Sequence, residues 1–159
     1  MKSAFTTLFI FIATFGLTQS STDFQNTIIG NWNGKGTLFG TQASFSMEWG
    51  QVLNKKFIKL VFENKFEDQS GVERVMNAHA YYDLSSMKGQ WFDSRGMILP
   101  LRLEINDNMM TVFWGSDNTE QGKTVYSILD GEKMNVQDYV LRNENYQAFG
   151  EAQYEKIKE

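Results

Sequence analysis

The sequence has no cysteine, one histidine (His79) and one proline (Pro100) in 159 residues. Without thiols the chain cannot form disulfides, so its stability must come from the burial of apolar side chains. The same absence excludes a lipoprotein that carries its lipid on a cysteine. A zinc site needs three or four nitrogen or sulfur ligands, which a single histidine cannot supply.

Positive charge is also sparse. The chain has 15 Lys and Arg against 19 Asp and Glu, a formal net charge of −4. The basic residues are scattered singly along the sequence, so they form no stripe that could neutralise a run of phosphates. We therefore expect no nucleic-acid partner.

Motifs of catalysis are missing. The chain has no Gly-x-Ser-x-Gly turn, and a Ser-His-Asp triad would have to use His79. The run Gly34-Lys35-Gly36-Thr37 lacks the upstream spacing and the following helix of a phosphate-binding loop. These absences favour a binding protein over an enzyme, although an enzyme stays an open alternative.

The first twenty residues have the pattern of a secretory signal. Lys2 precedes an apolar run from Ala4 to Leu17, and small or polar residues end at Ser20. The pattern predicts cleavage after Ser20, a mature domain of residues 21–159, and a secreted or periplasmic location. The run is too short for a spanning helix and none follows, so we expect no membrane span after cleavage. The alternative is a segment that stays attached as an anchor.

The mature chain is expected to begin with a glycine-spaced strand over residues 28–36. Glycines such as Gly30 and Gly36 suit a strand that bends sharply or lets another backbone come close. Between them stands Trp32, whose ring can fill one end of a barrel while its indole N–H finds a partner near the rim. We assign Gly30 and Trp32 to closure of that barrel end.

Turn signals then recur at intervals of roughly ten residues, which is typical of an all-β meander. We predict ten strands and no helix of ten residues outside the signal. The strands are expected at residues 28–36, 42–53, 57–66, 72–83, 89–93, 97–105, 109–115, 123–129, 133–142 and 146–157. Pairing of the last strand with the first would close the sheet. The predicted fold is all-β, a single antiparallel β-barrel of about ten strands, calycin-like or lipocalin-like.

Alternating side chains predict which face of each strand points inward. The second strand places Phe45, Met47 and Trp49 on one face, a clean period of two. The fourth strand is less one-sided, and either of its faces could point inward. One face has Met76, Ala78, Ala80 and Tyr82, and the other has Val75, Asn77, His79 and Tyr81.

A ten-stranded barrel is wider than the eight-stranded size that side chains fill, so an internal cavity is expected. The aromatic content, with four Trp, thirteen Phe and six Tyr, fits a binding pocket. A well-filled core is the alternative interpretation. The candidate ligand-binding residues are Trp49, Phe62, His79, Tyr81, Trp91, Asp93, Trp114, Tyr126 and Asp138.

Three stretches resemble a known group of barrels: Gly30-x-Trp32-x-Gly34-x-Gly36, His79-Ala80-Tyr81-Tyr82 and Trp91-Phe92-Asp93-Ser94. Their pattern is similar to calycin-type barrels, which include lipocalins, fatty-acid-binding proteins and nitrobindins. The glycine run and the two later stretches most resemble the nitrobindin-like heme-binding barrels and an uncharacterised bacterial branch of them. The resemblance implies a ten-stranded barrel with a pocket for a small apolar or planar ligand.

The chain departs from the heme-binding pattern at one position. Nitrobindin-like barrels hold the heme iron through a histidine near the C-terminus, and this chain has no histidine after His79. Heme binding through His79 is therefore kept as an alternative, with Met or Tyr as the remaining axial candidates.

Two carboxylates could provide acid and base chemistry without a metal, namely Asp93 and Asp138. The alternative is that both are structural. Asp93 would then bind turn N–H groups or Arg95, and Asp138 would pair with Arg102 or Arg142.

The leading hypothesis is an exported barrel that binds a small hydrophobic or amphipathic ligand in its interior. A second hypothesis is a small enzyme that acts on a lipid-like or heme-like substrate through His79, Asp93 or Asp138. A third is a structural or interaction barrel without a small ligand, which an exposed apolar patch on its outer wall would favour. The oligomeric state is left open.

Overall fold

The computed structural model describes residues 19–158. The predicted signal therefore lies outside the described residues, apart from its last two positions. The described chain begins with a helix, α1 (Gln19–Ile28), and continues in ten strands. These are β1 (Gly30–Leu38), β2 (Thr41–Val52), β3 (Phe57–Glu67), β4 (Glu73–Asp83), β5 (Lys88–Asp93), β6 (Ile98–Asn106), β7 (Met109–Trp114), β8 (Gly122–Ile128), β9 (Lys133–Arg142) and β10 (Asn145–Lys156).

The ten strands form one closed barrel. Each strand pairs antiparallel with its neighbours in the sequence, and β1 pairs with β10 to complete the circle. The predicted all-β fold, a single closed antiparallel barrel of ten strands, is confirmed. The predicted strand ends differ from the observed ones by no more than two residues.

The helix α1 was not expected, and the prediction that the first strand begins at Ile28 is wrong. The helical sequence is rich in Ser, Thr and Asn, and its first turn has no acid and its last turn no base. Phe24 and Ile28 are four residues apart, so they share one face, and both are buried. Packing against the barrel, rather than intrinsic propensity, therefore stabilises this short helix.

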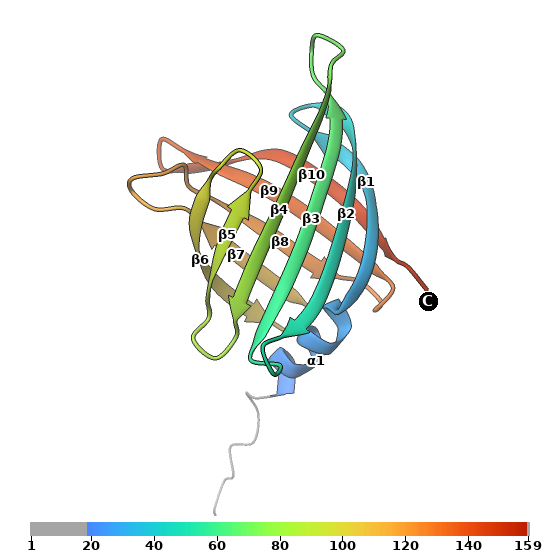
Figure 1. Ribbon diagram of the computed structural model, residues 1–159, viewed down its shortest axis with the longest axis vertical. Coiled ribbons are helices and arrows are strands. Elements are labelled where there is room, and N and C mark those ends of the chain that lie inside the picture. The colour runs from blue at the N-terminus through green and yellow to red at the C-terminus, as the bar shows by residue number, and fades with distance from the viewer. Residues whose placement is uncertain (1–18, 159) are drawn as a thin grey trace, which may run out of the picture.

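The two ends of the barrel differ (Figure 1). We call the end covered by α1 the helix end, where the β2–β3, β4–β5, β6–β7 and β8–β9 turns lie. The other five turns lie at the opposite end, which we call the far end. The hairpin between β3 and β4 rises above the rest of the far rim.

Aromatic side chains fill the helix end. Trp32 is 0% exposed and donates its indole N–H to the carbonyl of Ile28 at 2.8 Å. Trp49 stacks on Tyr82 and meets Tyr126 edge-on, both at 5.4 Å between ring centroids. An enclosed space next to α1, between residues that include Phe24 and Trp49, measures only ≈ 10 Å³. This half of the barrel is a packed core.

The β1–β10 seam depends on one glycine. A Cβ atom at Gly36 would overlap the carbonyl oxygen of Glu151 and the Cα of Ala152 on β10. The sequence-based expectation that a glycine here lets another backbone come close is confirmed. Gly50 on β2, by contrast, has open space around its Cα and no left-handed φ angle.

We predict that Gly36→Ala lowers the free energy of unfolding by about 1–3 kcal/mol, because the added methyl group forces β1 away from β10. Gly50→Ala is the matched control and should change stability little. Urea unfolding followed by far-UV circular dichroism measures both. Equal midpoints for the two variants would contradict this account of the seam.

We also predict that Trp32→Ala costs about 3–5 kcal/mol of stability, because it removes a fully buried ring from the helix end. Phe92→Ala is the control, since Phe92 is 41% exposed on the outer wall. Thermal unfolding measures the difference. An unchanged melting temperature of Trp32→Ala would refute the predicted role of Trp32 in closing this end.

Candidate functional site

The middle of the barrel and its far half have a wall of aromatic rings in contact. Phe45 lies between Tyr154 and Phe62, with centroid distances of 5.9 and 6.4 Å, and Phe62 lies 5.9 Å from Trp91. Phe62, Trp91 and Trp114 face inward and are nevertheless only half-buried. Their partial exposure distinguishes this half from the fully packed helix end.

A polar group lies on another part of the inner wall. Asp138 faces inward from β9, on the same face as the buried Val136. Its Oδ1 accepts a hydrogen bond of 2.6 Å from the Thr124 hydroxyl on β8. Its Oδ2 lies against Gly150 of β10, where a Cβ atom would come within 3.2 Å.

Burial controls the ionisation of these groups. It raises the pKa of Asp138 to about 6, and the hydrogen bond from Thr124 opposes this rise only in part. Burial likewise raises the pKa of Tyr126 well above its usual value, and the nearby Tyr82 and Asp138 raise it further. Tyr154 is shifted in the same direction, first by burial and then by the charge of Asp138. The phenols are therefore neutral at physiological pH.

Asn64 is a second polar residue of the inner wall. It faces inward from β3, is 4% exposed, and its side-chain oxygen accepts no hydrogen bond from any residue of the described chain. In the circular strand order, β3 and β9 are separated by three strands one way and five the other. Asn64 and Asp138 therefore stand on roughly opposite walls.

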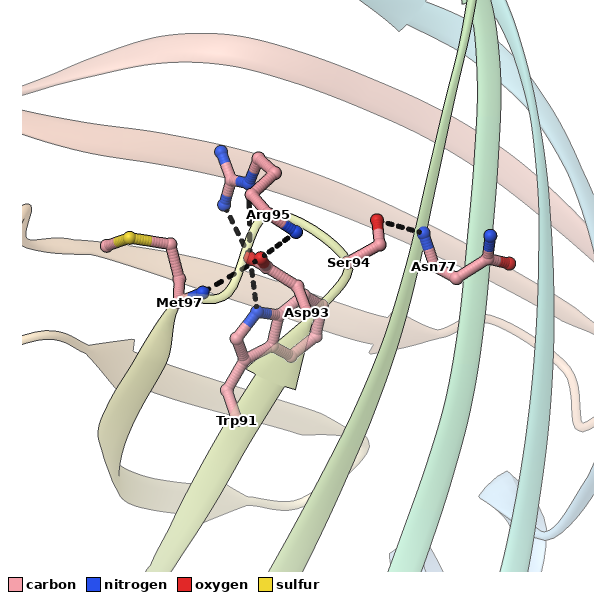
Figure 2. Close-up of polar contacts among 6 residues, drawn as sticks. All are labelled: Asn77, Trp91, Asp93, Ser94, Arg95 and Met97. Atoms are coloured by element: carbon pink, nitrogen blue, oxygen red, sulfur yellow. Dashed lines mark hydrogen bonds and ion pairs between the residues drawn. The ribbon is translucent and has the colours of Figure 1, made fainter.

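Asp93 is held in a structural turn (Figure 2). Its side chain is 0% exposed and accepts hydrogen bonds from the Trp91 indole at 3.0 Å and from Arg95 Nη2 at 2.6 Å. The backbone N–H groups of Arg95 and Met97 also donate to it. Burial alone would raise the pKa of Asp93, but the hydrogen bonds from Arg95 and Trp91 outweigh it and lower the pKa. The predicted contacts of Asp93 with turn N–H groups and with Arg95 are confirmed.

The prediction that Asp138 pairs with Arg102 or Arg142 is wrong. Arg102 pairs with Glu104, and Arg142 pairs with Glu120, so neither arginine neutralises Asp138. Asp93 is hydrogen-bonded to Trp91 and Arg95, whereas Asp138 is hydrogen-bonded to Thr124. The two carboxyl groups therefore do not form an acid–base pair.

His79 and Tyr81 lie on the outer wall, so the expectation that they line the interior is wrong. His79 is exposed and sits between Val61 and Phe92 in the sheet, and the Tyr81 ring contacts Phe92. The inward face of β4 carries the small Ala78 and Ala80 and the buried Tyr82 instead. His79 is therefore not placed to ligate a heme held inside the barrel.

The other candidates face inward. Trp49 and Tyr126 belong to the packed helix end, whereas Phe62, Trp91, Trp114 and Asp138 line the half-open part. Asn64, Thr124, Tyr82 and Tyr154 were not predicted as site residues. The strict alternation of β3 and β10 does place Asn64 and Tyr154 on their inner faces, and this pattern could have identified them.

An open cleft with a volume of ≈ 690 Å³ lies near the far end, on the side of β1 to β4. Its walls include the outward-facing Lys35, Ser44 and Lys65, which are neighbours in the sheet. This open cleft is polar and is not the enclosed chamber that the strand number predicts. The aromatic rings of the inner wall take up much of the expected width.

Three phenylalanines meet at the far rim. Phe39 stacks on Phe149 at 5.2 Å and lies 5.9 Å from Phe66. Phe39 is 62% exposed and has a φ angle of 51°, an unusual left-handed conformation for a bulky residue. Its backbone N–H donates to the Phe149 carbonyl at 2.7 Å, which fixes the β1–β2 turn over β10.

Within residues 19–158, no group of three or more His, Asp or Glu side chains is arranged to hold a metal ion. None of the helices in this part of the chain has the length and apolar character needed to cross a membrane.

Comparison with known proteins supports the fold. No protein-family model matches the sequence, and no curated protein matches it. Among solved structures, the barrel is similar to the S-type phycobiliprotein lyase CPES from Guillardia theta, with a TM-score of 0.56 and 9% sequence identity. The match covers 89% of this chain and 95% of the lyase. The chain thus has a calycin-like barrel fold, and no sequence match assigns it to the nitrobindin or the lipocalin branch.

The raised pKa of Asp138 predicts a pH-dependent stability. Because the folded-state pKa of about 6 exceeds the ordinary value of 3.8, the folded protein holds this proton more tightly. The contribution of Asp138 to stability is then complete below about pH 4 and is lost as the pH rises through about 6. Asp138→Asn should remove this loss. The difference in melting temperature between Asp138→Asn and the wild-type protein should therefore shift in favour of the variant as the pH rises from about 4 to about 6. Parallel melting profiles would contradict the assignment.

Proposed function

We propose that this protein is an exported barrel that binds a small hydrophobic or amphipathic ligand in its interior, entered from the far end. The observation that carries the proposal is the half-exposed inner wall. Phe62, Trp91 and Trp114 face inward and are only half-buried, whereas Trp49 and Tyr82 at the helix end are fully covered.

The composition of this wall fits a ligand site. Small-molecule sites are mostly apolar and aromatic, with a few converging polar groups that orient the ligand. Here the polar groups are Asp138, Thr124 and Asn64, and the pKa of Asp138 is perturbed by burial. Similarity of the barrel to a phycobiliprotein lyase is consistent with this use of the interior.

Export is the second part of the proposal, with a secreted or periplasmic location. It is supported by the amino-terminal sequence pattern, because Lys2 and the apolar run precede a small-residue cleavage site. Cleavage after Ser20 would leave Phe24 and Ile28 in the mature chain, and both are needed to cover the helix end.

The placement of other residues gives no support to the enzyme and heme alternatives. His79 is on the outside, and Asp93 is occupied by Arg95 and Trp91, so the enzyme hypothesis keeps only Asp138 of its three residues. Heme inside the barrel would have to find an axial ligand other than His79.

A blocking substitution tests interior binding. Val140 is inward-facing and half-buried on β9, two residues beyond Asp138 toward the far end. We predict that Val140→Phe weakens binding of the fluorescent apolar probe N-phenylnaphthylamine by about tenfold, because the ring occupies the entrance. Gln137→Phe, on the exposed face of the same strand, is the matched control and should bind as wild type does.

Circular dichroism establishes that both variants are folded. The proposal fails if the wild-type protein does not bind the probe, or if Val140→Phe and Gln137→Phe bind it equally well.

A further inference from the structure

In the half-open part of the barrel, the polar side-chain atoms that lack partners are hydrogen-bond acceptors. The other buried atoms without a partner are the Trp49 indole N–H, which lies in the packed helix end, and the side-chain oxygen of Asn135, which is on the outward face of β9. The Asn64 side-chain oxygen is buried and receives no hydrogen bond within the described chain. Asp138 receives one hydrogen bond, from Thr124 to Oδ1, and no hydrogen bond to its Oδ2 is seen among the described residues. A buried acceptor without a donor is costly, so the Asn64 position favours an occupant that donates. The free Oδ2 of Asp138 can accept a second hydrogen bond from the same kind of group.

Basic side chains near the interior are engaged elsewhere. Arg95 is bound to Asp93 at the far rim, and Arg74 is bound to Asp68 on the β3–β4 hairpin. At the helix end, Lys156 donates to the Thr27 carbonyl at 2.8 Å and lies over the Trp32 ring. Within residues 19–158, no ion pair to Asp138 is found.

This arrangement favours a ligand with a positive charge over one with a negative charge. A carboxylate ligand would need donors or a cation in the wall, and would meet the charge of Asp138 instead. A protonated amine brings both a positive charge and N–H donors, and an N–H···O contact to a charged acceptor is the stronger kind of hydrogen bond. The aromatic wall then covers the apolar part of the same molecule.

We propose that the ligand is an amphipathic amine, whose N–H donors bind the free carboxylate oxygen of Asp138 while its apolar part packs against Phe62 and Trp91. The inference rests on the proposed function, because it names the chemistry of the ligand for the same interior site. Asn64, on the opposite wall, is a second acceptor for an N–H or O–H group of a longer ligand.

Displacement of bound N-phenylnaphthylamine by three ligands of equal chain length tests the proposal. The competitors are dodecylamine, dodecanol and dodecanoate, used below their micelle-forming concentrations at about pH 8, where Asp138 is ionised. We expect dodecylamine to displace the probe at a concentration about tenfold lower than dodecanoate, with dodecanol between them.

Two charge variants separate the interior from the surface. Asp138→Asn should abolish the preference for the amine over the carboxylate. Glu151→Gln removes one negative charge from the exposed face of β10 and should keep the preference.

The outcomes distinguish the two proposals. If the probe binds but dodecanoate displaces it as well as dodecylamine does, the amine assignment is overturned and interior binding stands. A preference that survives in Asp138→Asn, or that disappears in Glu151→Gln, also overturns the assignment. If the wild-type protein binds no probe, the proposed function fails, and the amine assignment fails with it.

Discussion

Closure of the sheet through the β1–β10 pair is the constraint on which the rest of the structure depends. The pair exists because Gly36 lets the backbone of β10 approach to a distance that any side chain would forbid. Closure removes both sheet edges and gives every strand an inner and an outer face. Asp138 and Asn64 can therefore be held inside by the strand alternation alone, and His79 is held outside by the same rule.

The two ends of the barrel divide stability from binding. At the helix end, α1 and the rings around Trp49 form a core with almost no free space. In the other half, inward-facing rings stay half-exposed, a buried carboxyl has no cation, and a buried amide oxygen has no donor. Polar groups of this kind lower stability, and a packed helix end supplies enough burial to tolerate them.

Sequence patterns predicted the fold well, because alternation and turn residues are local signals. The position of α1 could not be predicted, since its Ser-, Thr- and Asn-rich sequence forms a helix only against the barrel. The fourth strand was ambiguous because both of its faces mix large and small or polar side chains, and the outward face supplied His79 and Tyr81 as candidates. Asn64 was overlooked because a single polar residue interrupts an otherwise apolar inner face.

The partners of the two carboxylates show why site geometry is harder to predict than the fold. Asp93 binds a residue two positions away, so its local turn could be foreseen. Asp138 receives a hydrogen bond from Thr124 on the neighbouring strand, fourteen residues away. That pairing depends on strand register, which the sequence does not specify residue by residue.

Native mass spectrometry of the protein purified from its own host tests the central claim most directly. The account predicts a complex that carries one small apolar molecule with a nitrogen donor, released when the barrel is denatured. A protein that reaches the spectrometer only as the bare chain, and that also takes up no amine when it is offered, would contradict the account.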